Sequence, residues 1–183
     1  MTDQPTTGLI MMVGLQGTGK SHLGRQIAEA LGAAVVQTDR VRKELFPNPS
    51  YAPWELGRVY AESYARIEVL LREGRLALFD ATNLKERDRR RVYDLARKHG
   101  AALCIVATWA PEAVVRQRLR AREQRPAEGD LSDAGTFVYE RAKVTAEPIA
   151  VPHIVANTTV SSRPIIELVR QRLTIPARTA RGE

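Results

Sequence analysis

The sequence predicts an α/β protein in which a parallel five-stranded sheet is covered by helices on both faces, giving three layers. Two observations carry this prediction. Strand-like runs alternate with helical patterns along the 183 residues, which is the order expected of β-α-β units. The strand-like runs are also continuously apolar rather than alternating with polar residues, as expected for strands buried on both faces of a parallel sheet.

The expected elements follow from the length and spacing of the apolar residues. Short apolar runs are read as strands, and apolar residues three or four apart are read as helix faces. The expected strands are Leu9–Val13, Ala33–Gln37, Leu76–Asp80, Ala101–Thr108 and His153–Ala156. The expected helices are Lys20–Leu31, Trp54–Glu73, Leu84–His99, Pro111–Glu123, Ser132–Thr145 and Arg163–Leu173. We expect one domain over residues 1–175, followed by a polar tail at 176–183.

The octapeptide G-L-Q-G-T-G-K-S follows the first expected strand and opens the first expected helix. This strand–loop–helix context is the one that a phosphate-binding loop requires, because glycines let backbone N–H groups turn around a polyphosphate at a helix N-terminus. Lys20 supplies a charge for the β- and γ-phosphates, and Ser21 supplies a hydroxyl for Mg²⁺. The sequence therefore predicts ATP and Mg²⁺ as ligands. The residues expected to contact the nucleotide are Gly14, Gln16, Gly17, Thr18, Gly19, Lys20, Ser21, His22 and Arg118.

Composition and charge limit the other classes of function. No apolar run approaches the roughly 18 residues that a membrane span needs, and the first residues lack the basic-then-apolar order of a signal peptide. Cys104 is the only cysteine, so no intrachain disulfide can form and a cytoplasmic setting is expected. The three histidines lack metal-ligand spacing. A net charge of +7 is compatible with an anionic partner, although arginine-rich composition alone does not identify one.

An acid and an arginine follow the second expected strand. Asp39 ends the run, and Arg42 comes three residues later, so a helix that begins near Asp39 would place both side chains near one face. Phosphoryl transfer to a hydroxyl needs a group that aligns or deprotonates that hydroxyl. Asp39 is the candidate for this role, and Arg42 is the candidate for binding an anionic acceptor. The simpler alternative is that Asp39 only caps the helix.

The third expected strand ends in Asp80, followed by Ala81, Thr82 and Asn83. An aspartate after four apolar residues is typical of a magnesium-binding strand end, so Asp80 is a candidate for Mg²⁺ or for the acceptor side, with Thr82 and Asn83 beside it. The segment from Asn83 to Glu86 also matches a capping box, which gives Asn83 a structural role as the alternative.

An arginine-rich segment, R-Q-R-L-R-A-R, covers residues 116–122. Arg118 and Arg122 are four residues apart, so they can present two guanidinium groups to one ligand. The polar segment that follows is expected to be a loop, and a lid over about residues 120–132 could bring Arg122 to the transferred phosphate. The alternative is a solvated basic helix face.

Taken together, these motifs resemble the small P-loop kinases, and the resemblance covers roughly residues 9–173. That group includes phage-type polynucleotide 5′-kinases, gluconokinase-like sugar kinases, zeta-toxin kinases and predicted kinases with an AAA-like domain. The segments that carry it are Gly14–Ser21, Thr38–Lys43, Asp80–Leu84, Arg118–Arg122, Leu131–Ala134 and Glu147–Pro148. One departure is that this chain reads D-A-T-N where those kinases often read D-T-N.

The resemblance implies a P-loop NTPase-type sandwich with a small arginine-bearing lid. It also implies that Asp39 is the general base, that Arg42 contacts the acceptor, and that Arg122 reaches the transferred group. The predicted activity is transfer of the ATP γ-phosphate to a hydroxyl, with a polynucleotide 5′-OH as the first candidate and a sugar, nucleoside or antibiotic hydroxyl as the alternative. The rivals are an NTPase switch without an acceptor and a nucleic-acid-binding protein. No membrane contact and no obligate protein partner are expected.

Overall fold

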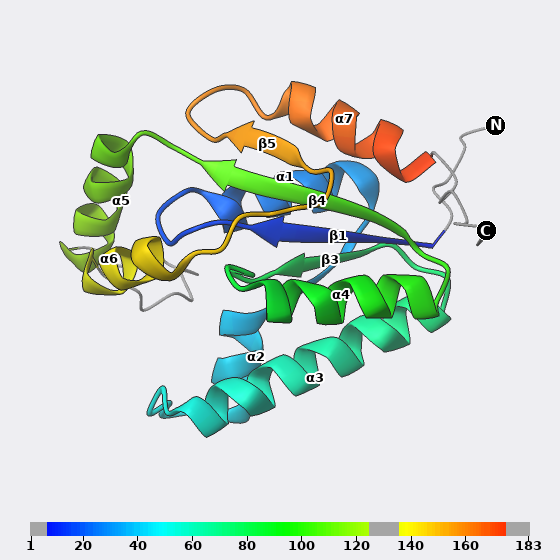
Figure 1. Ribbon diagram of the computed structural model, residues 1–183, viewed down its shortest axis with the longest axis horizontal. Coiled ribbons are helices and arrows are strands. Elements are labelled where there is room, and N and C mark those ends of the chain that lie inside the picture. Colours follow the sequence, from blue (N-terminus) through cyan, green and yellow to red (C-terminus); the bar gives the residue numbers. More distant parts are fainter. Residues whose placement is uncertain (1–6, 125–135, 175–183) are drawn as a thin grey trace.

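A computed structural model describes residues 7–124 and 136–174 of the chain. Its centre is a five-stranded parallel sheet with the strand order β2-β3-β1-β4-β5. The strands are β1 (Gly8–Val13), β2 (Ala34–Gln37), β3 (Ala77–Asp80), β4 (Ala102–Trp109) and β5 (Ile154–Asn157). Each lies within one residue of its predicted bounds, and helices cover both faces of the sheet (Figure 1). The predicted fold class is therefore confirmed.

Seven helices connect and flank these strands within the described ranges. They are α1 (Lys20–Leu31), α2 (Thr38–Leu45), α3 (Pro53–Arg72), α4 (Glu86–Lys98), α5 (Glu112–Gln124), α6 (Thr136–Thr145) and α7 (Arg163–Thr174). The helix expected near Asp39 forms as α2. The first four residues of the helix predicted at Ser132–Thr145, and most of the predicted lid, lie outside the described residues. None of the described helices is long and apolar enough to cross a membrane.

Alternate residues of the central strands pack into two separate cores. On one face, Leu9, Met11 and Phe79 pack with apolar residues of α2, α3 and α4. On the other face, Ile10 and Met12 pack with α1 and α7. All five of these side chains are fully buried, so β1 is apolar throughout because both of its faces lie in a core.

A third, smaller core lies beyond the carboxyl ends of the strands, where α5 and α6 pack together (Figure 1). Val115 and Leu119 of α5 contact Tyr139 of α6, and Leu15 of the loop after β1 packs against them. The octapeptide loop is thus attached to the α5–α6 pair as well as to the sheet.

Candidate active site

The octapeptide forms the connection between β1 and α1, as the sequence predicts. Gly14 has φ +152° and Gly19 has φ +85°, values that side-chain-bearing residues rarely adopt. A Cβ on Gly14 would collide with the Thr108 hydroxyl and lie 2.9 Å from the Thr108 carbonyl oxygen. The loop can therefore follow this path only with glycine at its start.

Three threonines hold this loop to the neighbouring strands. Thr18 donates its hydroxyl to Leu15 O at 2.7 Å, and its oxygen lies 2.9 Å from the hydroxyl of Thr108 at the end of β4. Thr158, directly after β5, donates its hydroxyl to Thr18 O at 2.6 Å. These bonds fix the path of the loop between β1 and α1.

Arg118, which the sequence predicts to contact the nucleotide, lies against the octapeptide loop. Its Nη1 lies 3.4 Å from Gly17 O and 3.0 Å from Thr158 Oγ1, and its Nη2 donates to Thr158 O at 3.1 Å. The guanidinium group thus ties α5 to the loop and to the segment after β5. In this arrangement two of its nitrogens hold the loop in shape. Arg122 lies in the last turn of α5 and is half-buried.

The residues of this site fit a nucleotide polyphosphate with Mg²⁺. Gly19 is the N-cap of α1, no side chain of that residue can cap the helix, and the first turn of α1 contains no acidic residue. The first N–H groups of an α-helix have no partner within the helix, so this end is open to an anion. Lys20 and Ser21 begin α1 and are half-buried, as is Gln16, whereas His22 is exposed. Lys20 and Ser21 would hold the phosphates and the metal.

The predicted metal ligands do not form a cage of carboxylates. Among the residues that the structure describes, no three His, Cys, Asp or Glu side chains gather into a metal site. Asp80 ends β3 with its side chain buried, and Ser21 begins α1. A Mg²⁺ ion shared between phosphate oxygens and one or two protein groups needs no more than this.

The candidate acceptor side follows from the strand order. Strands β2, β3 and β1 are neighbours and parallel, so the segments after their carboxyl ends lie at one edge of the sheet. Asp39 lies half-buried in the first turn of α2, and Arg42 follows one turn later with only 8% of its surface exposed. The Nε and Nη1 atoms of Arg42 are buried and have no hydrogen-bond partner among the described residues. Buried guanidinium donors without an acceptor are costly, so Arg42 is suited to bind an anionic group.

Tyr51 covers the guanidinium group of Arg42, with its ring centroid 4.9 Å from Cζ. The backbone of Tyr51 has φ +59°, which is uncommon for a bulky residue. Glu55 of α3 holds it there, because its carboxylate accepts the Tyr51 N–H at 2.8 Å and the Ser50 hydroxyl and N–H at 2.6 and 2.9 Å. The Ser50 hydroxyl is the main cause that lowers the pKa of Glu55, together with these backbone bonds and the charge of Arg42.

Tyr60 of α3 lies near the residues that follow β2 and β3. Its hydroxyl is close enough to Thr82, Asp39 and Asp88 for these residues to affect its pKa. Burial, with a smaller effect of these two carboxylates, raises the pKa of Tyr60 to about 12. The ring packs on Phe79, at 6.2 Å between centroids, whereas the hydroxyl lies near the candidate acceptor residues.

Asn83 does not cap α4, so the predicted capping box is wrong. The helix begins at Glu86 with Lys85 as N-cap, and the N–H of Glu86 donates to the Glu147 carboxylate at 2.7 Å. Asn83 is fully buried, has φ +49°, and donates its side-chain N–H to Met12 O at 2.8 Å. Beside it, Gly14 N donates to Thr82 O at 3.1 Å. These bonds join the segment after β3 to the start of the octapeptide loop.

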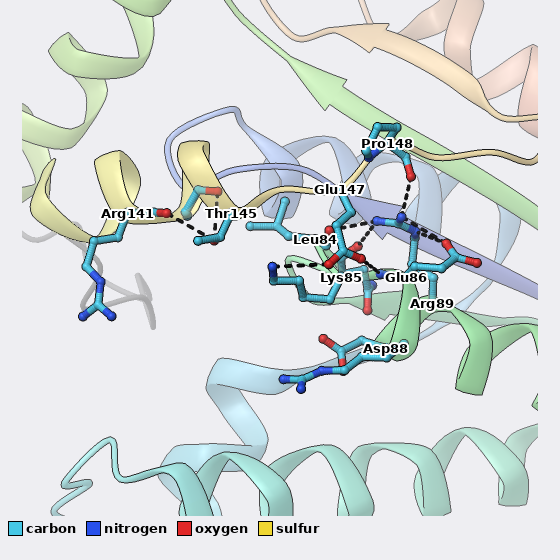
Figure 2. Close-up of polar contacts among 12 residues, drawn as sticks. Leu84, Lys85, Glu86, Asp88, Arg89, Arg141, Thr145, Glu147 and Pro148 are labelled. Carbon is cyan, nitrogen blue, oxygen red and sulfur yellow. Dashed lines mark hydrogen bonds and ion pairs between the residues drawn. The ribbon is translucent and has the colours of Figure 1, made fainter.

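Arg89 is the residue near this site that sequence reasoning missed. It is fully buried in the first turns of α4 and contacts both the segment after β3 and Pro148 (Figure 2). Three further arginines lie within two residues of it. The signal that could have found it is helical spacing, because Arg89 lies three and seven residues before Val92 and Ala96 on the buried face of α4. Thr158 and Glu55 were missed because isolated threonines and glutamates carry no local signal.

The comparisons with known proteins agree with this geometry. Residues 9–149 match the model of a family described as an AAA domain. An uncharacterized protein of Mycobacterium tuberculosis and one of Mycobacterium bovis are each 33% identical to the chain over 89 residues, which is 42% of this chain. The match covers 18% of the length of these relatives, so the chain corresponds to one part of a longer protein there.

Three solved structures illustrate the fold that this chain shares. Kti12 from Chaetomium thermophilum, in complex with ADP-AlF3, has a TM-score of 0.74 at 17% identity and covers 90% of this chain and 98% of that one. The APS kinase CysC of M. tuberculosis, in complex with AMPPNP and APS, has a TM-score of 0.70 at 16% identity, covering 93% and 99%. A gluconokinase from Sinorhizobium meliloti has a TM-score of 0.61 at 20% identity, covering 91% of each chain. The chain belongs to the AAA domain family and has the fold of the small P-loop kinases.

Proposed function

We propose that the protein is an ATP- and Mg²⁺-dependent kinase that transfers the γ-phosphate to a hydroxyl group. The observation that carries this proposal is the pairing of two half-sites at one edge of the sheet. One is the glycine loop with the open end of α1. The other is Asp39, one helical turn from a buried arginine with unused donors. An NTPase without an acceptor has no need of the second half-site.

Each residue has a specific role in the proposed transfer. The acceptor oxygen forms a bond to the γ-phosphorus as the bond from that phosphorus to ADP breaks, and Asp39 takes the proton of the acceptor hydroxyl. Lys20 and the N–H groups at the start of α1 would hold the phosphates. Ser21 and Asp80 would hold Mg²⁺, which would supply charge neutralisation during transfer. Arg42 binds an anionic part of the acceptor, with Thr82 and Asn83 beside it. Arg122 stabilises the transferred group.

The first candidate acceptor is a polynucleotide 5′-OH. The net charge of +7 supports it, because basic surfaces attract nucleic acid. A small anionic molecule with a hydroxyl is the second candidate, because the unused donors of Arg42 suit a single phosphate, sulfate or carboxylate group. The gluconokinase and the APS kinase that share the fold are named for small acceptors.

A panel of acceptors distinguishes the two candidates. The protein is incubated with labelled ATP, Mg²⁺ and one of a 5′-OH oligonucleotide, nucleosides, gluconate, adenosine 5′-phosphosulfate, UDP-sugars or aminoglycosides. Label on the oligonucleotide supports the first candidate, and label on a small molecule supports the second. Release of labelled phosphate with no label on any member favours an NTPase switch.

The role of Asp39 is tested by Asp39→Ala. We expect phosphotransfer to the acceptor found in the panel to fall by roughly 10²- to 10⁴-fold, because a general base contributes about that much. Binding of a non-hydrolysable ATP analogue, measured by calorimetry, should remain because the phosphate loop is intact. Asp94→Ala, which removes an exposed carboxylate of α4, is the matched control. Full phosphotransfer in Asp39→Ala would refute the base assignment.

A further inference from the structure

The guanidinium group of Arg89 makes four hydrogen bonds and an ion pair. An arginine side chain has five N–H groups. Nε lies 3.1 Å from a Glu86 carboxylate oxygen, and Nη2 lies 3.0 Å from the same oxygen. Nη1 donates to Asn83 O and Leu84 O, both at 3.0 Å, and Nη2 donates to Pro148 O at 2.6 Å. Each of the three nitrogens of this fully buried side chain thus donates to at least one acceptor.

These contacts join segments that are far apart in the sequence. Asn83 and Leu84 belong to the segment between β3 and α4, whereas Pro148 belongs to the connection between α6 and β5 (Figure 2). Removing a guanidinium group from water is costly, and an apolar side chain of similar volume would often be at least as stable. The burial of Arg89 is therefore better explained by the contact that it maintains between the segment after β3 and Pro148 than by a gain in stability.

Glu147 holds the same two segments from the outside. Its N–H donates to Leu84 O at 2.9 Å, and its carboxylate accepts the N–H of Glu86 at 2.7 Å and lies 3.3 Å from Lys85 Nζ. The connection after α6 is thus attached to the segment after β3 at two adjacent residues, by the buried arginine and by an exposed carboxylate (Figure 2).

The segment held in this way carries residues of the candidate acceptor side. Asn83, whose carbonyl accepts from Arg89, donates its own side chain to Met12 O two residues before the octapeptide loop. The carbonyl oxygen of its neighbour Thr82 accepts the N–H of Gly14, and Thr82 lies close to the hydroxyl of Tyr60. A displacement of Leu84 and Asn83 would therefore move Thr82 and the start of the phosphate loop with it.

We propose that Arg89 is a positioning residue for the phosphotransfer site. Together with Glu147 it braces residues 82–86 against residues 147–148, so that Thr82 and Asn83 keep a fixed place beside the phosphate loop. The assignment of Thr82 and Asn83 to an acceptor site rests on the proposed function, whereas the bracing itself does not.

Hydrogen–deuterium exchange of the full chain tests the bracing. Arg89→Lys keeps a positive charge but has only three donors on one nitrogen, which cannot reach four acceptors. We expect amides of residues 83–86 and of residue 147 to exchange about tenfold faster or more, as the loss of charge-assisted hydrogen bonds predicts. Glu147→Ala should accelerate the same amides, and Glu147→Gln should restore them because its amide oxygen can still accept the N–H of Glu86.

A matched arginine controls for changes that only affect stability. Arg97 lies on the same helix and pairs with Asp94 three residues earlier at 2.7 Å, as Arg89 pairs with Glu86, but its side chain is exposed. Arg97→Lys should leave exchange in both segments unchanged. Wild-type protection of residues 83–86 and 147 in Arg89→Lys would overturn the proposal, and so would faster exchange spread evenly over all the strands.

ATP turnover separates the positioning role from the bracing. With ATP and Mg²⁺ as the only additions and water as the acceptor, Arg89→Lys should lower kcat several-fold and raise KM for ATP, because the start of the phosphate loop moves with Thr82. An unchanged kcat together with faster exchange would overturn the positioning role. If the wild-type protein does not bind nucleotide, the proposed kinase function is contradicted. The exchange result would still test the bracing by Arg89, because it does not depend on nucleotide.

Discussion

At the scale of single residues, the site depends on a glycine at position 14 as much as on its functional side chains. Gly14 lies at the point where the loop passes closest to β4, and its φ of +152° belongs to a region used almost only by glycine. Thr108, which occupies the space next to it, also bonds Thr18 and Val13 O. A methyl group at position 14 would therefore displace the residue that holds the loop in shape.

We predict that Gly14→Ala lowers the free energy of unfolding by roughly 1–3 kcal/mol, the usual cost of a residue held in a disfavoured backbone conformation. It should also weaken binding of an ATP analogue, measured by calorimetry. Gly57→Ala is the matched control, because Gly57 lies within α3 and a Cβ there would meet nothing within 4 Å. That variant should gain about 0.5–1 kcal/mol in chemical denaturation. Equal effects of the two substitutions would show that the backbone conformation of Gly14 is not the cause.

The residues of the candidate site differ in how well the sequence predicts them. The octapeptide is local, so its residues and its place between a strand and a helix follow from pattern alone. Arg42 also follows, because it lies one helical turn from Asp39. Arg89 and Thr158 do not, since their partners are about 60 and 140 residues away in the chain. The capping box predicted at Asn83 is wrong because the same short sequence also fits a buried turn, and only the contact with Met12 distinguishes the two.

At the scale of elements, the strands were predicted to within one residue because short, continuously apolar runs in an α/β chain form strands that are buried on both faces. Among the predicted helix ends that lie in the described residues, only the start of α4 differs by more than one residue. The start of α4 lies two residues after its predicted position because Glu147, which is distant in sequence, accepts the first free N–H of the helix. The pairing of one helix with another was not predictable, because it depends on side chains that meet only in the folded chain.

The contact between α3 and α4 illustrates such a pairing. Glu68 of α3 accepts Lys98 Nζ of α4 at 2.7 Å and Arg72 Nη2 at 2.8 Å, and His99 Nε2 lies 3.5 Å away. The hydrogen bond from Arg72, followed by the one from Lys98, lowers the pKa of Glu68 to about 2. A carboxyl group with a lowered folded-state pKa stabilises the protein above its unfolded pKa, and this contribution is lost as the pH falls through the folded value.

We therefore predict that Glu68→Gln destabilises the protein most above about pH 4.5, with the difference from wild type shrinking toward pH 2. Thermal unfolding followed across this range measures the difference directly. Glu29→Gln, at an exposed position of α1, controls for the change in net charge. A difference between Glu68→Gln and wild type that stays constant from pH 5 to pH 2 would show that the ion pair is not its cause.

At the scale of the whole molecule, the α5–α6 pair and the sheet meet at the phosphate loop. Leu15 packs against the small core of α5 and α6, and Arg118 joins α5 to Gly17 and Thr158. A nucleotide bound in this loop contacts a segment that several elements share. Ligand binding to the folded state alone stabilises the whole chain by an amount set by ligand concentration and affinity.

We predict that Mg²⁺ with a non-hydrolysable ATP analogue at about 100 times its Kd stabilises the protein by about 2.7 kcal/mol, which raises Tm by roughly 5–10 °C in a chain of this size. Lys20→Ala should remove this shift, because Lys20 begins α1 at the open end where the phosphates would bind. A shift retained in Lys20→Ala but abolished by moderate salt would point to nonspecific attraction by the net charge of +7.

Analogue without Mg²⁺ should give a smaller shift, since Ser21 and Asp80 would then have no ion to share with the phosphates. An equal Tm shift with and without Mg²⁺ would contradict the prediction that the site binds the metal.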